Sequence, residues 1–294
     1  AIGHLAMQEN TSGASNTALG KHALFTNTTV SNLTAVGRSA LYANTTGTNG
    51  VAVGKDALQA NTTGDNNTAI GLEALQTNTT GDSLTAVGTG ALASNTTASN
   101  NSAFGRSAGG AITTGHSNTA MGSQAADAIT TGSFNSAFGI NALGATTTGI
   151  SNVAIGGGVL LANTTGGSNT AIGNSALEAS TTASNNTCIG RTTGASITTG
   201  AGNVFIGHEV GNNTVSVTTG SDNIAIGFHA RLNAVDAANQ MVMGKQVTCQ
   251  GNNNFTFGNG ATDSNIVFGE TSISAPSDER YKEEITTSTA GLSF

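Results

Sequence analysis

The chain has 294 residues and a net charge of −7, with 41 Gly, one Pro, no Trp and only nine Lys plus Arg. So few cations form no basic stripe that could neutralise phosphates, which argues against binding to nucleic acid or to an anionic membrane surface. Charged residues make up 9% of the chain and hydrophobic residues 37%, whereas disorder combines low hydrophobicity with high charge, so we expect an ordered, fibrous protein.

A short motif, Ala-Ile-Gly or a close variant, recurs with a 17-residue period from Gly3 to Gly207. Such a period is typical of a repeat array, in which each unit is too small to bury an apolar face alone and stacks on its neighbours. One unit reads Thr-Ala-Ile-Gly-x-x-Ala-Leu-x-x-Asn-Thr-Thr-Gly-x-x-Asn, and residues 68–81 show it well. Because the array opens within a unit at Ala1, we expect a further N-terminal part of the protein before it.

The residues before each glycine predict a short strand. The position directly before the glycine is always apolar, and the position before that is alanine in most units, from Ala18 to Ala171. Since neighbouring strand residues face opposite sides, we expect the apolar column to face a roomy core and the alanine column a space too tight for larger side chains. A second apolar patch, such as Ala23-Leu24 or Ala74-Leu75, suggests a return strand and hence two strands per coil.

These patterns predict an all-β fold, a parallel β-solenoid or β-roll of 17-residue coils over residues 1–207. A helical solenoid is the competing architecture, but so short a repeat cannot hold two helices and their turns. Coils at about 4.8 Å spacing would stack Asn on Asn and Thr on Thr, so we expect hydrogen-bonded ladders. In each Thr-Thr pair, such as Thr79-Thr80, one side chain should point inward and the other outward. The glycine after the pair gives the backbone freedom for a sharp turn.

Residues 208–275 should form a tapering C-terminal part of the rod. After Gly207 the coil-marking glycines are Gly227, Gly244, Gly258 and Gly269, so one longer unit is followed by units that become progressively shorter. We expect the three additional residues of the long unit, within 211–215, to form a protruding loop. The apolar content also rises toward this end, which suggests that chains pack together more closely there; the residues are Met241, Met243, Phe255, Phe257 and Phe268.

No residue pattern before Pro276 predicts chemistry on a separate substrate. Cys188 stands where most units have alanine, so we interpret it as core filling, and its distance from Cys249 supports neither a disulfide nor a metal site. The five histidines lie in different coils without the spacing of metal ligands, and the acidic residues do not form acid-base pairs. We therefore expect no enzyme, no metal and no cofactor, and because no apolar run approaches about 20 residues, no membrane insertion in this segment.

Residues 276–294 change to a charged composition, with Ser277 and Asp278 followed by acidic residues. Such residues favour a helix start, because unpaired amides and the helix dipole attract oxygen and negative charge. We expect a short helical or neck segment there.

Two families resemble parts of this sequence. Units such as Asn67-Thr68-Ala69-Ile70-Gly71 are similar to the head repeat of YadA-type trimeric adhesins, although the adhesin unit is usually shorter. That resemblance covers about nine tenths of the chain and implies a homotrimer of parallel β-rolls, packed or intertwined. The segment 277–285, Ser-Asp-Glu-Arg-Tyr-Lys-Glu-Glu-Ile, resembles the opening of the self-cleaving intramolecular chaperone domain that ends many phage tail fibres and tailspikes. The resemblance implies Ser277 and Lys282 as the catalytic pair, with cleavage between Ser277 and Asp278.

The leading hypothesis is therefore a structural fibre protein, the homotrimeric shaft of a phage tail fibre or similar host-attachment appendage, located in the virion. A bacterial surface adhesin or self-assembling extracellular filament is the alternative, and an outward threonine column that binds ice or a polysaccharide is the third. The expected partners are two further copies of this chain and a cell-surface polysaccharide or protein receptor, with no nucleic acid.

Overall fold

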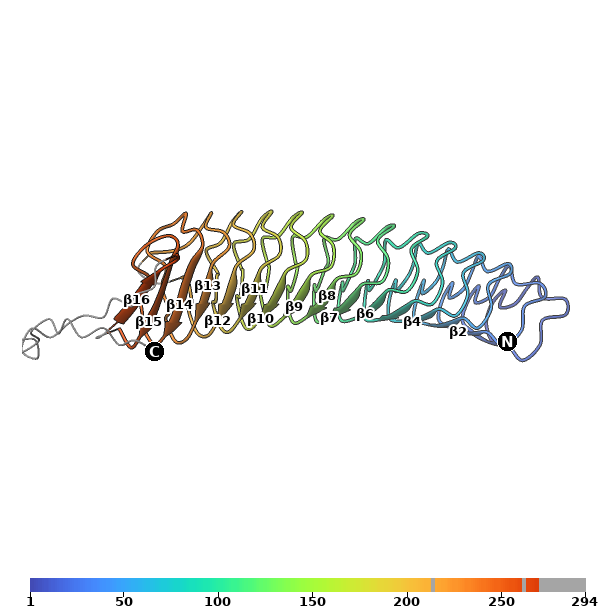
Figure 1. Ribbon diagram of the computed structural model, residues 1–294. Coiled ribbons are helices and arrows are strands. Elements are labelled where there is room, and N and C mark those ends of the chain that lie inside the picture. Colours follow the sequence, from blue (N-terminus) through green and yellow to red (C-terminus); the bar gives the residue numbers. More distant parts are fainter. Residues whose placement is uncertain (213–214, 261–262, 270–294) are drawn as a thin grey trace, which may run out of the picture.

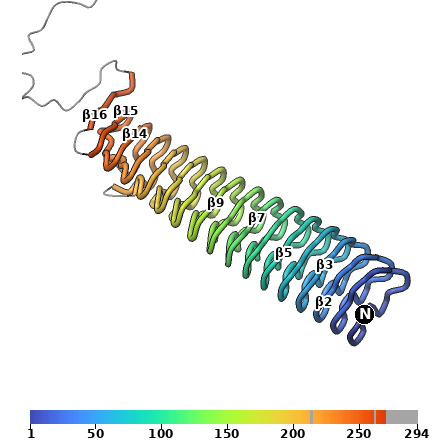
Figure 2. The backbone as a smooth tube through the Cα atoms, turned by 90° about the horizontal axis from the view of Figure 1, so that it is seen from below, coloured from blue at the N-terminus to red at the C-terminus, as the bar shows by residue number. Residues whose placement is uncertain are grey.

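The computed structural model describes residues 1–212, 215–260 and 263–269, and in these residues the chain is an all-β rod without helices (Figure 1). The strands lie side by side along one side of the rod, and the rest of each coil arches back over the other side (Figure 1). Seen from below, the coils form a regular stack from the N-terminal residues to the C-terminal strands (Figure 2). The predicted fold class, a parallel β-solenoid with 17-residue spacing, is confirmed.

Sixteen strands of the described residues form one sheet in chain order. Their bounds are β1 Thr17–Leu19, β2 Thr34–Val36, β3 Val51–Val53, β4 Thr68–Ile70, β5 Thr85–Val87, β6 Ser102–Phe104, β7 Thr119–Met121, β8 Ser136–Phe138, β9 Val153–Ile155, β10 Thr170–Ile172, β11 Thr187–Ile189, β12 Val204–Ile206, β13 Ile224–Ile226, β14 Gln240–Gly244, β15 Asn254–Gly258 and β16 Asp263–Val267. Strands β1 to β15 pair in parallel, and alanine lies beside alanine in most pairs, as Ala69 does beside Ala86.

The C-terminal end differs from a simple taper. The β14 and β15 strands are parallel, with Gly244 beside Gly258 as the glycine spacing predicts, but β16 runs antiparallel to β15. The interval that ends at Gly269 is therefore a hairpin that covers the β15 edge, and the prediction of a further, shorter coil there was wrong. The β15 edge is thereby paired, and β16 is the last strand of the sheet in the described residues. Residues 270–294, with the predicted helical segment, lie outside the described residues.

The interior of the rod is narrow and is lined by the alanine column, which corrects the expected orientation of the strands. Ala52, Ala69 and Ala86 are fully buried, while the apolar residues before the glycines lie on the outer side of the sheet and remain partly exposed. A 17-residue coil encloses too little space for large side chains from both sides. The buried leucines of the returning segment, such as Leu58 and Leu75, fill it, so only alanine fits opposite them.

The returning segment is not a second strand, so the prediction of two strands per coil was wrong. Ala74 and Leu75 are adjacent, yet both are fully buried, which strand alternation does not allow. The backbone turns instead: Ala74 N–H donates to the carbonyl of Gly71, and Leu75 has a φ of 51° in the left-handed region. Coils remain joined through bonds such as Leu75 N–H to the carbonyl of Ala91, at 3.0 Å.

The threonine pairs form an outer corner rather than alternating inward and outward. Thr45 and Thr46 are both exposed, and the residues enclosing them, Asn44 and Gly47, are buried. The first hydroxyl of the pair donates to the next coil, as in Thr45 Oγ1 to the carbonyl of Thr62 at 3.0 Å, and the same bond recurs along the rod. From Thr62 on, the first threonine of each pair is half-buried and the second is exposed. The expected inward threonine was wrong because a tight turn, unlike a strand, turns neither central residue into the core, but the expected threonine ladder is confirmed.

Two buried asparagine ladders, also as predicted, run inside the rod and exchange places near its middle. In the N-terminal half, the Asn78 amide donates to Asn61 Oδ1 at 2.8 Å. In the C-terminal half, the ladder occupies a later position in the coil, as in Asn135 to Asn118 at 3.1 Å. The Asn101 amide donates to Asn95 Oδ1 at 3.3 Å and joins the two ladders. Most of these amides thus satisfy the next one, as a buried polar side chain requires, although Asn27 Oδ1 and Asn163 Oδ1 have no partner among the described residues.

The glycine that marks each coil is required by the close approach of successive backbones. Gly122 has a φ of +135°, and a Cβ there would lie 2.6 Å from the carbonyl oxygen of Gly139 in the next coil. Real Cβ atoms do not approach a backbone oxygen so closely, and side chains rarely adopt this φ. The column of glycines therefore fixes the register of the stack.

The three additional residues of the long unit close on themselves and leave the neighbouring coils in register. Asn212 and Ser216 form an antiparallel bridge, and Val217 N–H donates to the carbonyl of Gly211 at 3.1 Å. Because the loop holds these additional residues, Val204 of β12 lies beside Ile224 of β13, a longer sequence offset than between the preceding strands. This places the insertion where the sequence predicted it, although residues 213–214 within the loop are outside the described residues.

Candidate functional site

The broadest candidate site is the outer face of the sheet, which we define as the first and third residues of β1 to β13 together with residues 241, 243, 255 and 257. The third residues of β1 to β13 are all apolar, and the first residues are Thr, Ser, Val or Ile. None of the side chains on the outer face is charged. The outer face is thus a continuous stripe of apolar and small hydroxyl side chains along the rod.

The exposure and size of the outer face exceed what isolated surface residues explain. Ile70, Phe104 and Met121 are 41%, 39% and 40% exposed. Fourteen coil-to-coil steps of about 4.8 Å and a strand width of about 10 Å give a face of roughly 670 Å². The largest apolar patch of a typical monomer is about 300–600 Å², and specific interfaces take about 600–1,000 Å² from each partner, a range whose lower part includes the outer face. The outer face is therefore large enough for a protein interface.

The outer face becomes more apolar toward the C-terminal end. Its first column is mostly threonine as far as β11 but changes to Val204, Ile224, Met241 and Phe255. The rings of Phe255 and Phe257 lie 5.1 Å apart on the same strand. A partner placed on the outer face would bury the most apolar surface at this end.

Six of the nine Lys and Arg residues stand directly after a coil-marking glycine, in a column along one edge of the outer face. This column holds Lys21, Arg38, Lys55, Arg106, Arg191 and Lys245. Arg38 and Lys55 both reach the buried carboxylate of Asp56, at 3.1 and 3.4 Å. Because both cations are at least half exposed, each ion pair adds at most about 1 kcal/mol. The column thus places charge beside the outer face at six coils, three of them near the N-terminal end, and leaves the centre of the face uncharged.

The remaining candidate residues divide into three groups. Ser277 and Lys282 lie outside the described residues. Cys188 is fully buried in the alanine column and has a free thiol, as expected for core filling, and burial raises the pKa of that thiol. Cys249 is also buried and free. Asn44, which matches a glycosylation acceptor, is buried with its amide donating to the carbonyl of Gly47, so the turn explains it.

The histidines are less scattered than the sequence suggested. The rings of His208 and His229 lie 5.5 Å apart, and Glu209 contacts both of them. Spacing along the chain missed this cluster because residues one coil apart are spatial neighbours in a solenoid. The signal was present in the position of each residue relative to its coil-marking glycine. His208 and Glu209 directly follow Gly207, and His229 is the second residue after Gly227.

Neither a cavity nor a membrane segment is found in the described coils. The rod encloses no pocket between residues 1 and 269, the gaps at 213–214 and 261–262 aside. The same residues contain no helix of the length and apolarity that crossing a bilayer requires. Comparison with protein-family models, with characterised proteins and with solved structures finds no match.

Proposed function

We propose that this chain is a structural fibre protein, the shaft of a homotrimeric phage tail fibre or a similar host-attachment appendage, carried on the virion. The observation that carries the proposal is the outer face: an uncharged, half-exposed stripe that follows the whole rod. Burial of apolar surface contributes about 25 cal/mol for each Å² removed from water. Association of like chains along the rod would bury the apolar surface of the outer face and so be favourable.

Trimerisation is supported by the resemblance to trimeric adhesin heads and by the geometry of a straight stripe. Three parallel rods can each turn one face toward a common axis in closed rotational symmetry, so that no apolar outer face remains exposed to solvent. The charged column, from Lys21 to Lys245, would then lie at the rim of the interface, where charge remains hydrated. The exposed threonine corners would remain on the outside, available to a cell-surface polysaccharide or protein receptor.

The alternative is a bacterial surface adhesin or a self-assembling extracellular filament. It would use the same rod and the same outer face, so the two proposals differ in what the fibre is attached to. An anchor or secretion domain in the same protein would favour the adhesin, whereas recovery of the chain from virions would favour the tail fibre.

Sedimentation equilibrium of the whole chain tests the proposed assembly. We expect a mass about three times the chain mass of 28.8 kDa. Replacing Met121, Phe138 and Ile155 with lysine places three charges in the centre of the outer face and should give monomers with an unchanged far-UV circular dichroism spectrum. A matched control has lysine in place of Thr114, Thr131 and Thr148, which are exposed at the threonine corner of the same region. This variant should remain trimeric. A monomeric unmodified chain would contradict the proposal.

A further inference from the structure

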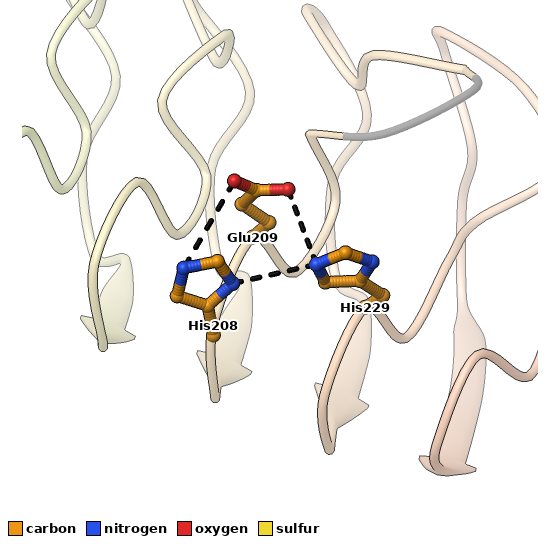
Figure 3. Close-up of side chains that lie close together, drawn as sticks. All are labelled: His208, Glu209 and His229. Carbon is orange, nitrogen blue, oxygen red and sulfur yellow. Dashed lines mark hydrogen bonds and ion pairs between the residues drawn. The ribbon is translucent and has the colours of Figure 1, made fainter.

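We propose that His208, Glu209 and His229 form a binding site for a divalent transition-metal ion of the zinc type. The three side chains point toward one another from two successive coils, His208 and Glu209 from the turn after β12 and His229 from the turn after β13 (Figure 3). The site is contained in one chain, so it does not rest on the proposed trimer or on the proposed function.

The distances within the cluster suit a small ion. His208 Nδ1 lies 3.4 Å from His229 Nε2, and His229 Nε2 lies 3.2 Å from Glu209 Oε2 (Figure 3). One potential ligand atom from each residue lies within 4.8 Å of the other two. Metal-ligand bonds of about 2.0–2.1 Å in a tetrahedral site separate the ligands by about 3.3 Å. Two of the three ligand pairs therefore already have the spacing that zinc requires.

The chemistry of the donors selects the class of ion. Two imidazole nitrogens and one carboxylate oxygen favour Zn²⁺ and related first-row ions over Ca²⁺ or Mg²⁺, which prefer oxygen ligands. All three side chains are partly exposed, at 34%, 32% and 20%. Solvent can therefore reach the cluster, and water can supply a fourth ligand.

The solenoid holds the ligands in place before any ion binds. The backbone N–H of His229 donates to the carbonyl of His208 at 3.0 Å, which joins the two coils directly beneath the site. The ring of Phe228 lies parallel to both imidazoles, with centroids 3.9 Å from His229 and 5.5 Å from His208. Glu209 and His229 occupy the same place in successive coils, both with left-handed φ, at 55° and 52°. Ligands fixed by packing lose little entropy on binding.

The guanidinium of Arg191 is the cation with which a metal ion would compete for His208 and Glu209. Its Nη1 lies 2.9 Å from His208 Nε2 and 3.9 Å from Glu209 Oε1. Coordination through His208 Nδ1 leaves the hydrogen on Nε2, so the guanidinium must move away from that nitrogen when the ion binds. The Arg191 side chain is 60% exposed and can turn into solvent. Arg191 thus supplies the positive charge beside Glu209 that a bound ion would replace.

The location indicates what the ion would do. The coil between His208 and His229 is the long unit, which alone among the steps from β1 to β14 departs from the 17-residue offset. An ion held by ligands from both ends of this unit would fasten the coils on either side of the 212–216 insertion. We therefore expect a structural clip at the irregular junction rather than a catalytic centre.

Calorimetric titration of the metal-free, tag-free whole chain with ZnCl₂ tests the proposal. We expect one tightly bound ion per chain, and the visible d–d bands of tetrahedral Co²⁺ when CoCl₂ replaces zinc. Glu209→Gln retains the side-chain volume, and His229→Phe retains the ring stack. Each should weaken binding by more than the about 10–100-fold that loss of an outer-shell partner costs. Arg191→Gln should tighten binding by up to about tenfold. The substitution removes the repulsion between the guanidinium and a divalent ion about 6 Å away, in surroundings with the dielectric constant of water.

The N-terminal end of the chain offers a matched control. His4 and His22 occupy the same two positions of successive coils as His208 and His229, with rings 6.1 Å apart, but Leu5 replaces the glutamate. His4→Ala with His22→Ala should leave zinc binding unchanged. The proposal is overturned if the unmodified chain shows no saturable site, if Glu209→Gln and His229→Phe bind zinc as tightly as the unmodified chain, or if the His4 and His22 control loses the ion.

Discussion

Phe205 and Gly211 pack together in the coil of β12, where most other coils have alanine and leucine. The double substitution Phe205→Ala with Gly211→Leu should therefore restore the common pair. Most coils have alanine in the strand and leucine in the following turn, as in Ala154 and Leu160. In the coil of β12, phenylalanine takes the alanine position and glycine the leucine position. A Cβ on Gly211 would lie 2.5 Å from Phe205 Cε2, so the phenyl ring fills the space that leucine fills elsewhere.

The magnitudes follow from this geometry. Phe205 is fully buried, and Phe205→Ala should cost about 3–5 kcal/mol of unfolding free energy through lost burial and a cavity. Gly211→Leu alone adds a side chain where the ring already lies and should cost about 1–3 kcal/mol or more. Other coils hold leucine at this position with a similar left-handed φ, 51° at Leu160 against 66° at Gly211. The double variant restores the common pair and should be more stable than Phe205→Ala, with a favourable coupling of about 1–3 kcal/mol.

Urea unfolding followed by circular dichroism measures these differences. The four proteins are comparable where their m-values agree, since a change in m would indicate a different unfolding unit rather than a different stability. Single-variant losses that simply add up in the double variant would refute the reasoning, because they would show that the ring and the missing leucine do not share one space.

Three further predictions follow from the coil geometry. Gly122→Ala should destabilise the rod by at least about 2 kcal/mol or prevent folding, because its Cβ would meet the backbone of Gly139. Gly251→Ala, whose Cβ would meet no atom within 4 Å, should change the urea midpoint little, and equal effects would contradict the close approach. Hydrogen bonds from the backbone N–H and hydroxyl of Thr48 lower the pKa of Asp65, so its stabilising effect is present above its unfolded pKa and is lost as the pH falls below about 4. Thr48→Ala should raise the pKa of Asp65 in an NMR titration, and an unchanged pKa would exclude the hydroxyl as a cause. Cys188 and Cys249 should not react with a thiol reagent until the chain is unfolded, because both are buried; rapid reaction of the native protein would indicate that the coils open.

The sequence predicts the strands and their register well because both depend on the glycine column. Strands β1 to β13 end directly before a coil-marking glycine and β14 and β15 end at one, and the spacing of those glycines gives the strand offsets through β15. The same regularity misled the prediction in the returning segment. Strand alternation assumes an extended backbone, whereas residues such as Leu75 and Glu73 have left-handed φ, which leucine and glutamate rarely adopt and which their identity does not signal.

The candidate sites could be predicted only in part. The column of apolar residues is visible in the sequence, but its outward direction depends on the narrow interior that Leu58 and Leu75 fill from the other side. The cluster of His208, Glu209 and His229 depends on which positions of two unequal coils meet. Counting residues along the chain could not show this, since the insertion at 212–216 changes the spacing while the backbone bond from His229 to His208 preserves the contact.

Cryo-electron microscopy of the intact fibre tests most directly whether the outer face is a contact between like chains. Three parallel rods per cross-section are expected, with a repeat of about 4.8 Å along the axis and with Phe104, Met121 and Phe138 turned toward the common axis. A fibre made of one rod, or of rods whose outer faces point into solvent, would contradict the proposed shaft.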